Sequence, residues 1–193
     1  EAYEYFLGWR RMCELTSANS CQDTFMCDGG RHECLPSWKF DDRLTREVGT
    51  GSAPDGDEDA ILGMILLLLA TQASPPPWWD ELARWTYDSC KSFLAHLTHV
   101  LSPPTHVTST GAPLRVLKLG SCWGGWSCVN PSYMAPGHYR SFRDFNLKYA
   151  PTFATAAEGV SLAAHWDELI ETSYMVLNEA QCSTTGLITN WWV

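Results

Sequence analysis

One stretch of the chain constrains its fold more than any other, because a cluster of acids leads directly into an almost wholly apolar segment. Residues 51–70 read Gly-Ser-Ala-Pro-Asp-Gly-Asp-Glu-Asp-Ala-Ile-Leu-Gly-Met-Ile-Leu-Leu-Leu-Leu-Ala. We expect a helix from about Asp57 to Gln72, ended by the prolines at 75–77, since proline cannot continue a helix. A helix that is apolar on every face must be buried. Its acidic entrance should therefore lie where a packed element meets a polar pocket floor or a cap.

The acids at this entrance allow two interpretations. They are Asp55, Asp57, Glu58 and Asp59. Carboxylates are favourable here because the free N–H groups and the positive dipole end of a helix stabilise negative charge, so the local pattern favours helix capping. The alternative is a substrate-binding cluster. A calcium loop of the EF-hand type is disfavoured, because its sixth position is Ala60 instead of glycine and its twelfth is Leu66 instead of glutamate.

Composition limits the class of protein. The chain has 193 residues, 45% of them hydrophobic, and a formal net charge of −9. This length and content predict one sizeable domain with a real core. The acidity argues against a nucleic-acid partner, which would require a basic surface. The apolar run is shorter than the ~20 residues of a membrane span, so we expect no transmembrane helix, and no signal peptide at Glu1.

Cysteine usage predicts an oxidising compartment. Eight cysteines stand at positions 13, 21, 27, 34, 90, 122, 128 and 182. An even number of this size suggests four disulfides and a secreted, extracellular protein, although the sequence does not give their connectivity. The close cysteine pairs of structural zinc sites are missing. We therefore expect no metal and no cofactor.

The rest of the chain alternates helical patterns with loops. Apolar residues recur at helical spacing in 1–15, 78–100 and 161–180, and Asn130-Pro131 is a typical start for a further helix that reaches about Tyr149. Residues 16–51 form a disulfide-held loop with a short extended piece at Trp38 and Phe40. Loop residues 103–113 precede a short strand at 114–119. The predicted fold class is mainly α.

Aromatic residues give the strongest functional signal. The sequence lacks a nucleophile elbow, a P-loop and a His-Glu-x-x-His pattern. His96 and His99 lie three apart on a helix, but without a third ligand we interpret them as surface residues. Ten tryptophans accompany the acidic cluster. Each alone is more often a core residue. Together, aromatic faces that stack on sugar rings and carboxylates that accept bonds from hydroxyls suggest a glycan cleft.

Three blocks of sequence resemble glycoside hydrolase family 8 in the same order. They are Leu-Pro-Ser-Trp-Lys-Phe at 35–40, Gly-Ser-Ala-Pro-Asp-Gly-Asp-Glu-Asp at 51–59, and Val-Asn-Pro-Ser-Tyr-Met-Ala-Pro-Gly-His-Tyr-Arg-Ser-Phe at 129–142. Residues 174–178 and 186–191 are similar to the family's continuation. The family includes bacterial endo-β-1,4-glucanases, chitosanases and xylanases. The resemblance implies that residues 1–193 are a single partial domain, part of an (α/α)6 barrel with disulfide-held loops.

The resemblance also implies roles for particular residues. It implies inverting hydrolysis of a β-1,4-linked polysaccharide, with Asp55 binding and distorting the sugar at the scissile bond. Tyr133 would line the same site and help to hold the attacking water. Asp57 and Asp59 would support the helix entrance, and Trp38 would match an aromatic of the cleft wall.

Two departures from the family pattern are important. The Ser-Glu-Gly motif that carries the general acid and the Tyr-Asp-Ala type of motif that carries the general base are both absent from these residues, and Pro54 replaces a common threonine. No catalytic residue is therefore assigned in this chain. We also expect only about half of the helices that such a barrel needs, which implies further polypeptide or an adjacent subunit.

Three hypotheses follow. The first is a portion of a secreted glycoside hydrolase whose catalytic acid lies elsewhere. The second is a non-catalytic extracellular protein that keeps the fold for glycan binding or for assembly into a filament or coat. The third is a purely structural helical domain in which the acidic block only caps a helix.

Overall fold

The computed structural model describes residues 2–16, 35–100, 114–121 and 128–192. The α-helices in these ranges are α1 (Ala2–Leu15), α2 (Pro54–Thr71), α3 (Trp79–Leu97), α4 (Pro136–Phe153) and α5 (Ala156–Glu179). The strands are short and form two antiparallel pairs, β1 (Lys39–Phe40) with β2 (Glu47–Gly49) and β3 (Thr98–Val100) with β4 (Arg115–Leu117). The predicted mainly α class is confirmed. Within these ranges, no helix has both the length and the apolar character that a membrane crossing requires.

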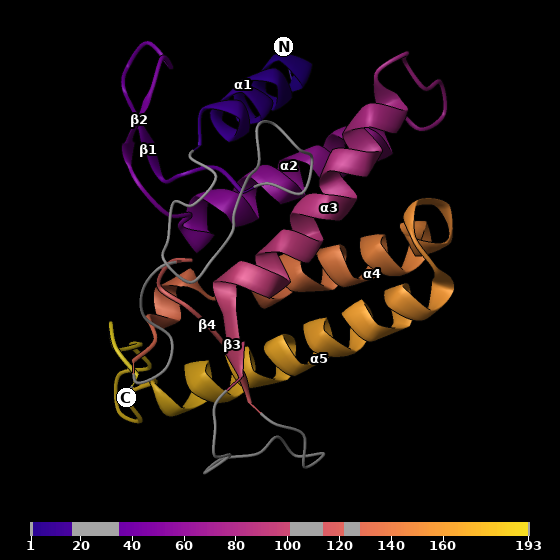
Figure 1. Ribbon diagram of the computed structural model, residues 1–193. Coiled ribbons are helices and arrows are strands. Elements are labelled where there is room, and N and C mark those ends of the chain that lie inside the picture. Colours follow the sequence, from indigo (N-terminus) through magenta and orange to yellow (C-terminus); the bar gives the residue numbers. More distant parts are fainter. Residues whose placement is uncertain (1, 17–34, 101–113, 122–127, 193) are drawn as a thin grey trace.

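The helices pack in sequence order. Figure 1 shows α4 and α5 running side by side, with α3 and α2 above them and α1 beyond α2. The packing of α4 against α5 at Ala150 depends on Gly159, because a Cβ atom there would lie 2.6 Å from the Cβ of Ala150. This glycine therefore lets the two helices pack at short range.

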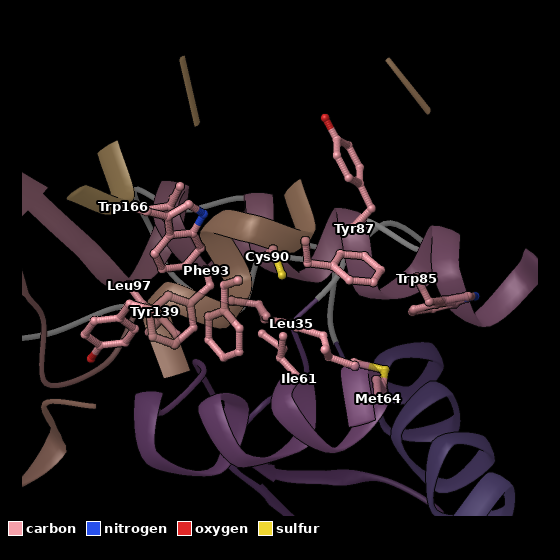
Figure 2. Packing of buried hydrophobic residues seen from close by; sticks show 14 of the residues in the cluster. Leu35, Ile61, Met64, Trp85, Tyr87, Cys90, Phe93, Leu97, Tyr139 and Trp166 are labelled. Atoms are coloured by element: carbon pink, nitrogen blue, oxygen red, sulfur yellow. The ribbon is translucent and has the colours of Figure 1, made fainter. Parts of the chain in front are cut away.

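An aromatic cluster from three helices forms the centre of the core. Phe93 of α3 contacts both Tyr139 of α4 and Trp166 of α5, with ring centroids 6.1 and 5.9 Å away (Figure 2). Tyr139 and Trp166 also stack on each other at 5.9 Å. The Trp166 indole N–H donates to Asn146 at 2.9 Å, so its one polar group is satisfied inside the core. This cluster fixes α4 and α5 against α3.

Helix α2 lies over this core but is not buried all round. Its buried apolar residues are Ile61, Met64, Ile65 and Leu68. Leu66 and Leu69, in contrast, are 56% and 48% exposed. The expectation that every face of this helix is covered is therefore wrong for the described residues. The apolar residues of α2 follow one another without a helical period and so occupy all faces of the helix. Because α1, α3 and α4 do not cover all of these faces, some of its leucines are exposed.

Four predicted helix limits change. The helix predicted to reach about Tyr149 continues to Phe153 and contains Pro151. Helix α2 begins at Pro54 instead of Asp57, because proline at the first helical position leaves no N–H unpaired. The helix predicted to reach residue 100 ends at Leu97, since residues 98–100 pair with β4 as a strand. The last helix begins at Ala156 instead of 161, where the Thr155 side chain accepts the N–H of Glu158 at 3.1 Å. The first helix and the strand within 114–119 are as predicted.

The helix predicted to start at Asn130-Pro131 is interrupted. Pro131–Tyr133 form one 3₁₀ turn, with the Asn130 side chain accepting from the N–H of Ser132 at 3.0 Å. The chain is then extended until α4 starts at Pro136. Pro136 disfavours helical geometry in the residue before it, Ala135, which explains the break. As a result Tyr133 lies on a separate turn ahead of the helix.

The predicted disulfides concern residues that are only partly described. No disulfide joins any two of Cys13, Cys90, Cys128 and Cys182. The other four cysteines, at positions 21, 27, 34 and 122, and the loop at 103–113 lie outside the described residues. The disulfide framework therefore stays a prediction. The described part of the 16–51 segment includes the β1–β2 hairpin.

Candidate functional site

A cavity of about 710 Å³ opens where α2 begins. Its described lining comes from α1, the segment before β1, the start of α2, the segment after β4 and the 3₁₀ turn. Asp55, Tyr133 and Trp38, the three residues predicted to bind substrate, all contribute to this lining. The fold thus brings together three side chains that are distant in the sequence.

Asp55 is the second residue of α2 and is exposed. The N-cap position belongs to Ala53, and no side chain forms a cap hydrogen bond there. None of the four acids is therefore the N-cap residue that the capping interpretation requires. The Asp55 carboxylate lies instead in the first helical turn, where the helix dipole stabilises a negative charge beside the cavity.

Asp57 lines the same cavity, although only 4% of its surface is exposed. Its carboxylate accepts a hydrogen bond from the Ser52 hydroxyl. The Ser52 N–H in turn donates to the Ser121 hydroxyl oxygen at 2.9 Å. Burial raises the pKa of Asp57 well above its usual range, and the neighbouring acids Glu58 and Asp55 raise it further. Asp57 thus joins α2 to the segment that precedes it.

Glu58 is a buried acid to which the sequence predictions gave no role. It accepts a hydrogen bond from the Tyr139 hydroxyl at 2.6 Å. Burial raises the pKa of Glu58 to about 8, although the hydrogen bond from Tyr139 lowers it. Burial and Glu58 together raise the pKa of Tyr139 as well. A neutral carboxyl therefore connects α2 to α4 at neutral pH.

The helical period could have identified Glu58 as buried. Positions 54, 58, 61, 65 and 68 follow one another at intervals of three and four residues, and all five are buried. Asp59 lies outside this row and is exposed. Its carboxylate is 3.3 Å from the Nε2 atom of His138, at the start of α4. It is not among the described residues that line the cavity.

Tyr133 and Glu58 contact the same hydroxyl group. The Tyr133 carbonyl oxygen lies 3.5 Å from the Tyr139 hydroxyl, and the Tyr133 N–H donates to the Asn130 carbonyl at 3.1 Å. Tyr133 itself is half-buried at the edge of the cavity. Tyr139 therefore fixes the 3₁₀ turn relative to α2.

Trp38 is the most exposed large aromatic of the cavity lining, with 55% of its surface accessible. Its backbone N–H donates to the Gly51 carbonyl at 2.7 Å. The Lys39 ammonium lies 5.5 Å from its ring centroid. Trp38 lines the same cavity as the Asp55 carboxylate. An exposed indole and a carboxylate in one cavity can hold a sugar ring, because the ring offers both apolar C–H and hydroxyl groups.

The two histidines predicted to lie on the surface are not fully exposed. His96 is half-buried, and burial with the nearby Lys118 lowers its pKa to about 4. The same two causes, in the same order, lower the pKa of His99. Both side chains are therefore neutral at pH 7. Among the described residues, no three or more His, Cys, Asp or Glu side chains form a group that could hold a metal ion.

Comparison with known proteins agrees with the resemblance seen in the sequence. Residues 24–193 match the model of the glycosyl hydrolases family 8. The chain is 26% identical over 161 residues to Endoglucanase C of Ruminiclostridium cellulolyticum and 27% identical over 161 residues to Endoglucanase 2 of Ruminiclostridium josui. It is 25% identical over 163 residues to Endoglucanase A of Acetivibrio thermocellus. Each match covers 81% of this chain but only 28% of the relative.

Proposed function

The chain belongs to glycosyl hydrolase family 8, and on this basis we propose that it is a portion of a secreted enzyme that hydrolyses a β-1,4-linked polysaccharide. The observation that supports this proposal is the single cavity lined by Asp55, Tyr133 and Trp38. Glucan is the first candidate substrate, because the relatives are named endoglucanases. The substrate class and the secretion of the protein are part of the proposal.

Each of the three side chains has a separate role in the proposed glycoside cleavage. The Trp38 indole stacks on the apolar face of a sugar ring, while the Asp55 carboxylate accepts hydrogen bonds from ring hydroxyls and holds the ring in a distorted form. A carboxylate next to the reacting carbon also stabilises the positive charge of an oxocarbenium-like transition state. The Tyr133 hydroxyl orients the attacking water.

The proton donor and the base come from polypeptide other than these described residues. Inverting hydrolysis needs two carboxyl groups about 6.5 to 9.5 Å apart, one protonating the leaving oxygen and one activating water. Asp57 and Glu58 are unsuitable, because each is buried and already hydrogen-bonded to a neighbouring hydroxyl. The uncovered leucines of α2 support the same inference, since an apolar helix face in a secreted protein needs a covering partner.

The substitution Asp55→Asn in the full-length protein tests this function. We expect hydrolysis of carboxymethyl cellulose to fall by a factor of about 100 or more, because the amide removes the charge that stabilises the transition state. Asp80→Asn, which removes an exposed carboxylate at the start of α3, serves as the control and should retain the wild-type rate. Proton NMR of the first products should detect the α-anomer, as inversion of a β-linkage requires.

Two results would contradict the proposal in different ways. A wild-type rate in Asp55→Asn would remove Asp55 from the site. Failure of the wild-type protein to cleave any β-1,4-linked polymer would reject the hydrolase and favour the non-catalytic glycan-binding or assembly protein.

A further inference from the structure

The indole of Trp38 rests directly on the backbone of Gly49. A Cβ atom built at position 49 would lie 2.6 Å from both Cε2 and Nε1 of Trp38, and 2.9 Å from Cζ2. Real Cβ atoms do not approach other heavy atoms this closely, so any larger residue at position 49 would displace the ring. The indole therefore occupies the volume that a side chain at position 49 would need.

Space, and not backbone conformation, explains the glycine at this position. Gly49 does not have the positive φ that favours glycine, in contrast to Gly51 with φ of 81°. Its neighbours in the hairpin carry side chains without difficulty. An alanine at position 49 would thus fit the backbone conformation, and its Cβ would clash with the Trp38 indole.

The hairpin is built so that Gly49 meets Trp38. Lys39 pairs with Gly49 but Phe40 pairs with Glu47, so Val48 is an extra residue on β2 and forms a bulge. A bulge changes the direction of the side chains that follow it. Two further hydrogen bonds hold residues 37 and 38, which precede β1. The Trp38 N–H donates to the Gly51 carbonyl, and the Ser37 hydroxyl donates to the Glu47 carboxylate at 2.5 Å. These bonds fix the backbone of Trp38, and the contact with Gly49 fixes its ring.

We propose that Gly49 is a positioning residue, which holds the Trp38 indole as a preformed stacking platform for a pyranose ring at the edge of the cavity. This inference rests on the proposed function, because it specifies how that same cavity binds its sugar. The platform is ordered before the ligand arrives, so binding does not have to immobilise a free indole. Preorganisation of this kind increases affinity by lowering the entropy cost of association.

The test is a double-mutant cycle in the full-length protein, with cellotetraose binding measured by isothermal titration calorimetry. Gly49→Ala should weaken binding by a factor of about 3 to 10, the range expected for one aromatic stacking contact. In the Trp38→Ala background the same substitution should have no effect, because no indole is left to displace. Gly8→Ala in α1 is the matched control and should leave affinity unchanged, since no heavy atom lies within 4 Å of its added Cβ.

The outcomes separate this inference from the proposed function. Equal affinity for wild type and Gly49→Ala would overturn the inference. A loss in Gly49→Ala that persists when Trp38 is alanine would also overturn it, because the loss would then come from a damaged hairpin. If the wild-type protein binds neither cellotetraose nor any other β-1,4-linked oligosaccharide, the proposed function itself fails.

Discussion

The buried carboxyl of Glu58 should make the stability of this protein fall as the pH rises through neutrality. The folded-state pKa is about 8, compared with an ordinary value of 4.5. Between these two values the folded chain keeps a proton that the unfolded chain releases, so the free energy of unfolding decreases with pH. The contribution of protonated Glu58 to the free energy of unfolding is complete below about pH 4.5 and is lost as the pH rises through about 8. Above that pH Glu58 is ionised in both the folded and the unfolded chain, so the lost stability no longer changes with pH.

The size of the effect follows from the shift in pKa. One unbalanced proton changes the free energy of unfolding by about 1.4 kcal/mol per pH unit. The penalty should therefore reach about 3 kcal/mol at pH 7 and at most about 5 kcal/mol above pH 8. This is a large fraction of the total stability of a typical domain, about 5 to 15 kcal/mol.

Glu58→Gln removes the titration while keeping the shape of the side chain. The amide oxygen can still accept the Tyr139 hydroxyl, as Glu58 Oε1 does at 2.6 Å. We expect the variant and the wild type to have similar stability at about pH 5, and the variant to be more stable by about 3 to 5 kcal/mol at about pH 9. Asp80→Asn, the exposed control on α3, should follow the wild-type profile.

Urea unfolding followed by far-ultraviolet circular dichroism, repeated across this pH range, measures the difference directly. Parallel profiles for wild type and Glu58→Gln would refute the reasoning, since Glu58 would then carry no extra proton in the folded state. If Asp57→Asn abolished the slope and Glu58→Gln did not, the proton would belong to Asp57, whose pKa burial also raises.

Two further predictions concern a thiol and a helix contact. Hydrogen bonds to two neighbouring threonines lower the pKa of the exposed Cys182 to about 6, whereas burial raises that of Cys90. In reduced protein at neutral pH, mass spectrometry should therefore find iodoacetamide on Cys182 long before it appears on Cys90, and equal rates would contradict this. Gly159→Ala should destabilise the protein by about 1 to 3 kcal/mol in urea unfolding, because its Cβ would lie 2.6 Å from that of Ala150. Gly137→Ala, with open space around its Cβ, should not, and an equal cost at both glycines would refute the packing argument.

The acids at the start of α2 illustrate how adjacent residues acquire different roles. Asp55 and Asp59 are exposed on either side of a buried pair, Asp57 and Glu58. Asp55 and Asp59 are four residues apart and share the exposed face of the helix, whereas the adjacent Asp57 and Glu58 point in different directions, Asp57 to Ser52 and Glu58 to Tyr139. Only Asp55 and Asp57 line the cavity among the described acids, so the cluster is not one uniform site.

The sequence by itself determined the helices and the residues worth considering. Periodic apolar residues and prolines act locally, so they predicted the class and most helix positions, and the three blocks identified Asp55, Tyr133 and Trp38 before any contact was known. The same local rules failed between Asn130 and Pro136, where the 3₁₀ turn that follows Asn130 ends at Tyr133 and α4 begins only at Pro136.

Only the tertiary structure decided which of these residues meet. The packing of α1, α2 and the 3₁₀ turn brings Trp38 and Tyr133 to the cavity of Asp55, and it buries Glu58 against Tyr139. The support of Trp38 by Gly49 is likewise a contact through space. Burial and shifted pKa values depend on which residues surround a group in the folded protein. Many of these neighbours are distant in the sequence, so local sequence patterns do not predict them.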